Sequence, residues 1–80
     1  MQNTQTLIIK IIEEALELEA GIIKEDSDSE GIENWDSLGQ LSILVALDKK
    51  FEGKISSISE IAEANSVQKI FSILKENSIY

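Results

Sequence analysis

The fold is decided by residues 34–51, NWDSLGQLSILVALDKKF. Asp36 and Ser37 are both favourable N-cap residues, because a side-chain oxygen of either can accept a hydrogen bond from the first turn of a helix. The residues that follow are rich in Leu, Ile, Val and Ala and contain no proline, so we predict a helix from about residue 37 to 50. Its N-terminus presents the Ser37 hydroxyl where free N–H groups and the macrodipole favour a bound anion.

Three other helices are predicted around this one. The first, about residues 4–19, has an apolar stripe opposite Lys10, Glu13, Glu14 and Glu17, and Gly21 is its expected stop signal. A short helix is expected at about 58–64. The last helix, about 66–76, should be capped by Ser66 and has apolar residues at helical spacing, namely Val67, Ile70, Phe71 and Leu74. The expected fold class is all-α, a four-helix bundle that forms one domain over residues 1–80.

The predicted loop, about residues 21–35, carries five of the 15 acidic residues. Glu25, Asp26, Asp28, Glu30 and Glu33 follow Lys24 without another base, so the segment should be solvated. Its length favours a function for the loop. At its end, Trp35 with Ile32 is expected to anchor the loop in the core.

Composition limits the functions that are possible. The chain has 80 residues, no cysteine, no histidine and a net charge of −8. We therefore expect no metal site built from thiolate or histidine, whereas weak binding of divalent cations by the acidic loop stays open. We also expect no binding to nucleic acid or to anionic membranes, and we favour partners with basic patches. The N-terminal segment resembles neither a signal peptide nor a membrane span, so a cytoplasmic monomer is expected.

Ser37 is not expected to be a catalytic nucleophile. A serine hydroxyl needs an adjacent base, and the chain lacks histidine. The neighbouring Asp36 is too weak a base near neutral pH to take that role if it is exposed. We therefore expect a protein that is not an enzyme and whose serine is modified by another protein.

The same stretch resembles the second helix of an acyl carrier protein. The resemblance rests on Asp36-Ser37-Leu38 and on the apolar spacing that follows, and it extends from about residue 7 to 74. The positions that carry the apolar spacing are Leu41, Leu44, Val45, Leu47 and Phe51. It implies that Ser37, flanked by Asp36 and Leu38, carries 4′-phosphopantetheine, the only thiol source that a chain without cysteine would have.

The resemblance also implies partners and a place for cargo. A phosphopantetheinyl transferase would attach the arm, and loading and transfer enzymes for acyl or aminoacyl groups would use it. The positions expected to face these partners are Leu38, Leu41, Val45 and Asp48. The cargo is expected to lie in part between the helices, at positions that are also candidates for plain core packing, namely Leu44, Leu47, Ile55 and Ile61.

The chain departs from the fatty-acid carriers in its charge layout. Those proteins usually have carboxylates along the exposed side of the second helix, whereas this chain has Gln40 and Ser42, and then Asp48 followed by Lys49 and Lys50. Its main acidic run lies upstream of this helix, in residues 25–36. We infer a carrier for a dedicated pathway. Gly39 in the first turn has two interpretations: space for a group on Ser37 or a docked enzyme, or a tolerated glycine at a frayed end.

Two alternatives stay open. Residues 26–31, DSDSEG, resemble the first half of an EF-hand loop, with oxygen ligands at positions 1, 3 and 5 and glycine at position 6. However, position 12 is Ser37, where the motif needs a bidentate glutamate. The other alternative is an unmodified acidic helical module that binds a partner through residues 37–50.

Overall fold

Helices are the only regular elements in residues 4–80, the part of the chain that the computed structural model describes. There are three α-helices, α1 (Thr4–Ala15), α2 (Ser37–Lys50) and α3 (Val67–Glu76), and one 3-10 helix, η1 (Ser59–Glu63). The all-α class is confirmed. The four-helix bundle is not, because the helix expected at 58–64 is a single 3-10 segment of five residues. Residues 1–3 of the expected domain lie outside the described part.

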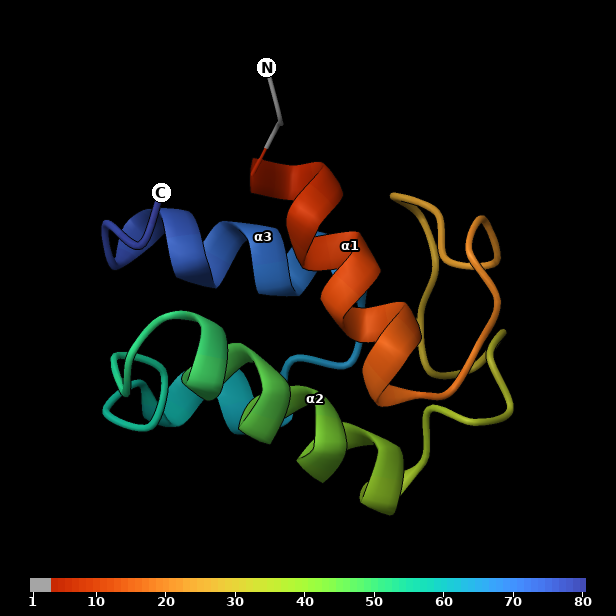
Figure 1. Ribbon diagram of the computed structural model, residues 1–80. Helices are drawn as coiled ribbons and strands as arrows, with labels where there is room; N and C mark the ends of the chain where they lie inside the picture. The colour runs from red at the N-terminus through yellow and green to blue at the C-terminus, as the bar shows by residue number, and fades with distance from the viewer. Residues whose placement is uncertain (1–3) are drawn as a thin grey trace.

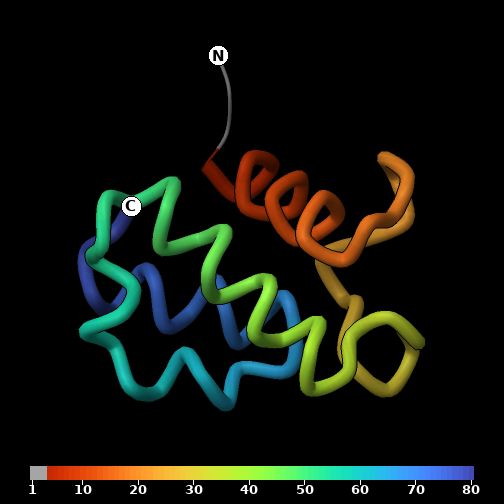
Figure 2. Tube along the Cα trace, turned by 60° about the horizontal axis from the view of Figure 1, so that its bottom comes forward, coloured from red at the N-terminus to blue at the C-terminus, as the bar shows by residue number. Residues whose placement is uncertain are grey.

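The helices surround one core (Figure 1). α1 packs on α2, and η1 contacts both α2 and α3. The loop of residues 16–36 lies on one side of the molecule, and the connection of residues 51–66 lies on the other, in both views (Figure 2). No helix within residues 4–80 has the length and apolar character to span a bilayer. The largest fully buried side chains are Ile8, Ile12, Ile43, Leu47, Ile55, Val67, Ile70 and Leu74.

All three α-helices end in the same way, with a residue other than glycine in the left-handed region. These residues are Glu17, Glu52 and Ser78, with φ of 58°, 56° and 58°. After each of them, the next N–H reaches back five residues to a carbonyl of the last turn, as in a Schellman motif. The three bonds are Leu18 N–H to Glu13 O (2.8 Å), Gly53 N–H to Asp48 O (2.8 Å) and Ile79 N–H to Leu74 O (2.9 Å).

This ending corrects the predicted length of the first helix. α1 stops at Ala15, because the chain reverses at Glu17, and it does not reach residue 19 or use Gly21 as its stop. Gly21, with φ 93°, lies farther along the loop. Spacing alone favoured the longer helix, since Leu16 and Leu18 continue its apolar character. The last helix agrees with its prediction: Ser66 is the N-cap and its side chain accepts from Lys69 N–H at 3.1 Å.

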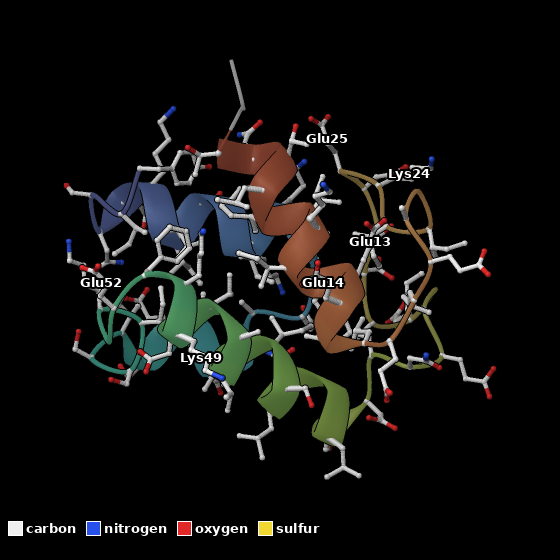
Figure 3. The ribbon with its side chains drawn as sticks, viewed as in Figure 1. Glu13, Glu14, Lys24, Glu25, Lys49 and Glu52 are labelled. Carbon is white, nitrogen blue, oxygen red and sulfur yellow. The ribbon has the colours of Figure 1, made fainter. Side chains whose placement is uncertain are left out.

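The sequence predicts Glu13 on the polar side of the first helix, and this prediction is wrong. Its side chain is only 4 % exposed. The Oε2 atom accepts hydrogen bonds from the N–H groups of Gly21 (2.8 Å) and Ile23 (3.0 Å). Figure 3 shows Glu13 extending from α1 toward this loop. A buried carboxylate therefore fastens the start of the loop to α1.

The acidic part of the loop is fastened to the residues before α3. Ser29 N–H donates to Asn65 O (2.9 Å), and Val67 N–H donates to Ser27 O (3.0 Å). These bonds form an isolated antiparallel bridge between Asp28 and Ser66. The loop is thus fixed near its start to α1 by Glu13, and in its middle to the start of α3 by this bridge.

Candidate functional site

Ser37 is the first residue of α2, and its side chain is exposed. The N-cap is Asp36, whose Oδ1 accepts from Gly39 N–H at 2.9 Å. The backbone supports Asp36 as the N-cap, because the Gln40 N–H donates the first hydrogen bond of the helix to Asp36 O at 2.8 Å. Within residues 4–80 no hydrogen bond engages the Ser37 hydroxyl. Of the two cap candidates, Asp36 therefore fills the role, and the serine oxygen is left accessible at the N-terminal end of a helix dipole.

The start of α2 is held tightly against both ends of the loop of residues 16–36. Gly39 is buried, and a Cβ there would overlap the carbonyl oxygen of Asn34 and lie 2.8 Å from Leu16 Cδ2. The Asn34 Nδ2 group in turn donates to Leu16 O at 2.9 Å. Neither sequence interpretation of Gly39 gave this reason. The glycine allows α2 to approach both ends of the loop closely, and this contact fixes the position of Ser37.

Trp35 and Gln40 connect the loop, α2 and η1. Trp35 is only 3 % exposed, which agrees with its predicted place in the core, and its Nε1–H donates to Gln40 Oε1 at 2.6 Å. The Gln40 Nε2 group donates to three carbonyl oxygens around η1, those of Ile61 (3.2 Å), Ala62 (3.3 Å) and Ala64 (3.0 Å). One half-buried amide thus joins three segments of the chain.

A polar groove opens directly beside Ser37. It has a volume of about 490 Å³ and is bordered by the loop, by the first turn of α2 and by η1. Most of its lining residues can form hydrogen bonds, while Trp35 and Ala62 add apolar surface, so it suits an extended ligand with polar and apolar parts. The lining residues are Ser29, Trp35, Asp36, Ser37, Gln40, Ala62, Glu63 and Asn65.

An apolar cavity lies farther along α2, between this helix and residues 55–62. Its volume is about 310 Å³, near the lower end for ligand pockets. Three of the four expected cargo positions line it, Leu44, Ile55 and Ile61. The fourth, Leu47, does not line it and packs in the core. The remaining lining residues are Val45, Asp48, Ser56, Ile58, Ser59 and Ala62.

The four expected docking positions differ in how much of each residue is exposed to solvent. Leu38, Leu41 and Val45 are 76 %, 57 % and 57 % exposed. At 100° per residue they fall on one side of α2, and Lys49 continues the same line. Asp48 is half-buried, and its Oδ1 accepts from Ser56 N–H at 2.8 Å. Its carboxylate therefore fastens the connection after α2, which the sequence did not indicate.

The acidic residues of the loop do not come together as the ligands of an EF-hand calcium site would. The Asp28 Oδ1 atom accepts from the N–H groups of Glu30 (3.1 Å) and Gly31 (3.0 Å) within its own turn. No group of three His, Cys, Asp or Glu residues in the described part of the chain is placed to hold a metal ion. No observation in residues 4–80 therefore favours a calcium site in this loop.

The roles of two residues, Gln40 and Glu13, were not predicted from the sequence. Gln40 was considered only for the charge it lacks, and its bonds depend on where η1 packs. For Glu13 a signal existed: it lies four residues after Ile9 and three before Leu16, on the apolar side of the helix. A carboxylate at such a position needs hydrogen-bond donors, and the loop supplies them.

Comparisons with known proteins give no relative. No family model, no curated protein and no solved structure matches the chain. The interpretation of the site therefore depends on its own geometry and on the resemblance of residues 36–51.

Proposed function

We propose that this protein is a carrier that holds an acyl or aminoacyl group on a 4′-phosphopantetheine arm attached to Ser37. The observation that carries the proposal is the state of this serine. Its hydroxyl is exposed and unengaged at the start of a fixed helix, because Asp36 takes the capping role. The resemblance of residues 36–51 to an acyl carrier helix supports it independently.

The surroundings of Ser37 suit a substrate of modification. In the reaction, the serine oxygen bonds to the pantetheine-side phosphorus of the coenzyme A diphosphate and loses its proton to a base of the transferase. The P–O bond to the other phosphate of the diphosphate breaks, and adenosine 3′,5′-bisphosphate leaves. The chain has no histidine, so a separate transferase would supply the base and the magnesium ion. The chain itself contributes an accessible hydroxyl in a fixed place.

The phosphodiester would also find a suitable environment. It would lie at the N-terminus of α2, where the helix dipole favours negative charge. The Asp36 carboxylate is close, but its Oδ1 already accepts from Gly39 N–H, which offsets part of the repulsion. The polar groove beside Ser37 could receive the amide-containing arm. The attached arm supplies the thiol that carries the acyl group as a thioester.

The apolar cavity gives the cargo a place to lie. Its walls at Leu44, Ile55 and Ile61 are aliphatic, and Ala62 lines both this cavity and the groove at Ser37. An acyl chain that passes from groove to cavity would bury part of its apolar surface against these walls.

We further propose that partner enzymes dock on the exposed side of α2. Leu38, Leu41 and Val45 form an apolar ridge there. No carboxylate interrupts the ridge, and its end is marked by Lys49, which Figure 3 shows extending from α2. Partners should therefore make mainly apolar contacts here, and the acidic loop should govern long-range attraction to basic surfaces.

Intact mass spectrometry tests the proposal. The protein is incubated with coenzyme A, magnesium and a broad-specificity phosphopantetheinyl transferase. We expect one phosphopantetheine adduct on the wild type, none on Ser37→Ala, and the full adduct on Ser42→Ala, which removes an exposed hydroxyl five residues along the same helix. The absence of an adduct on the wild type would contradict the carrier function.

The same sample separates the alternatives. Without an adduct, tight calcium binding with a change in circular dichroism would favour the EF-hand interpretation. Without an adduct and without a calcium response, the unmodified interaction module would be left, with α2 as its binding helix.

A further inference from the structure

The connection between α2 and α3 is fastened to α2 by two side chains, Gln40 and Asp48. At one end, the Gln40 amide donates to the carbonyl oxygens of residues 61, 62 and 64. At the other end, Asp48 Oδ1 accepts from Ser56 N–H at 2.8 Å. Within residues 4–80, these are the side-chain hydrogen bonds from α2 to residues 51–66. They are eight residues apart, a little over two helical turns.

The apolar cavity lies between these two attachments. On α2 it is lined by Leu44, Val45 and Asp48, and on the connection by residues 55–62. Gln40 is three residues from Ser37 and lines the groove beside it. The Gln40 end of the cavity is therefore the end that faces Ser37, and the Asp48 end is the far one.

Gln40 is suited to hold this end because its amide has both a donor and an acceptor. Its Oε1 accepts from the buried Trp35 Nε1–H at 2.6 Å, while its Nε2 group donates to the carbonyls around η1. A glutamate of the same shape could still accept from Trp35, but its second oxygen would face three carbonyl oxygens without a proton to donate. Replacement by glutamate should therefore release η1 and leave the indole bond in place.

We propose that Gln40 is a latch that holds η1 against α2 at the mouth of the cavity and opens to admit the cargo carried from Ser37. It is a positioning residue, and this role rests on the proposed carrier function. The attachment at Asp48 then stays closed and serves as the hinge. η1 is suited to move, because it has only five residues and Ile61 is the one that it buries in the core.

The latch is tested first in the unmodified protein. We expect Gln40→Glu to speed amide hydrogen exchange in residues 58–64 by at least about fivefold, the effect of losing one hydrogen bond of ordinary net strength. Exchange in α1 should not change. The matched control is Gln68→Glu, the same replacement on α3, where the exposed amide donates to Glu25 O. The single tryptophan, Trp35, reports by its fluorescence whether its surroundings stay intact.

The second measurement tests the effect on cargo. Wild type and variants are loaded by the transferase with octanoyl- or acetyl-phosphopantetheine, and hydroxylamine cleavage of each thioester is followed by mass. Gln40→Glu should speed cleavage of the octanoyl thioester by about fivefold or more. It should leave the acetyl thioester unchanged, since two carbons are too short to occupy the cavity. Gln68→Glu should match the wild type with both groups.

The outcomes distinguish this latch from the proposed function. If arms attach normally but octanoyl cleavage is the same in wild type and Gln40→Glu, the latch is overturned and the carrier stands. Faster exchange without faster cleavage likewise overturns the latch, leaving a structural bond. If no arm attaches to the wild type, the carrier function falls and the latch with it. Gln40→Ala, which removes the donor without adding a charge, must give the same direction of change.

Discussion

The two irregular segments that flank α2 differ in how they are held. Residues 16–36 are fastened by Glu13, a carboxylate that is 4 % exposed and bonded to two backbone N–H groups. Residues 51–66 are fastened by Gln40 and Asp48, which are both half-buried. The first segment packs tightly enough to need Gly39, whereas the second leaves an apolar cavity of about 310 Å³. The difference suggests that the first segment fixes Ser37 and the second can open.

The largest effect should come from removing the buried attachment. Glu13→Ala leaves the buried N–H of Ile23 and the partly buried N–H of Gly21 without their acceptor. We expect the free energy of unfolding to fall by about 3 kcal/mol, measured by urea denaturation. Glu14→Ala, one residue later and exposed (Figure 3), should change it by no more than about 0.5 kcal/mol. Equal losses in the two variants would show that Glu13 is not the attachment.

A smaller loss is expected where the first segment meets α2. Gly39→Ala places a methyl group against the Asn34 carbonyl, so the loop must shift, at a cost of about 2 kcal/mol. The modification rate at Ser37 should fall with it. Gly31→Ala is the matched control, because a Cβ there would meet its nearest atom, Asp28 Oδ1, at 3.7 Å. A Gly39→Ala protein as stable as wild type would mean that the close approach is not required.

The second segment should tolerate loss of an attachment better. Asp48→Ala removes the acceptor for Ser56 N–H, but this exposed amide can turn to water instead. We expect a loss of about 1 kcal/mol in the same urea measurement. Replacing Asp26, which is exposed and forms no bond in the described part of the chain, should have no effect beyond error. If Asp48→Ala lowered the free energy of unfolding as much as Glu13→Ala, the two segments would not differ in how firmly they are held.

The smallest effect concerns the turn that begins the first segment. Glu17 has φ 58°, a conformation that costs little only for glycine. Glu17→Gly should therefore raise the free energy of unfolding by about 0.5 kcal/mol. It also removes a negative charge from the C-terminal end of α1, which acts in the same direction. Thermal and urea denaturation of Glu17→Gly and Glu17→Ala measure this, and the alanine variant should show only the charge effect.

Much of the fold could be read from the sequence, because it depends on local chemistry. Periodicity and a cap residue placed α2 at Ser37–Lys50, and Ser66 marked the start of α3. The predictions were wrong where distant segments decide. Nothing near Ser59 indicates a 3-10 helix rather than an α-helix, and the end of α1 depends on a turn at Glu17 that has no glycine.

The sequence by itself determined the helical class and singled out Ser37, since cap preference and apolar spacing act over a few residues. Only the tertiary structure decided which of Asp36 and Ser37 is the cap. It also placed Glu13 in the interior and set the Gln40 amide between Trp35 and η1. The physical reason is that a buried polar group must find partners, and those partners come from whichever segments the packing of the core brings beside it.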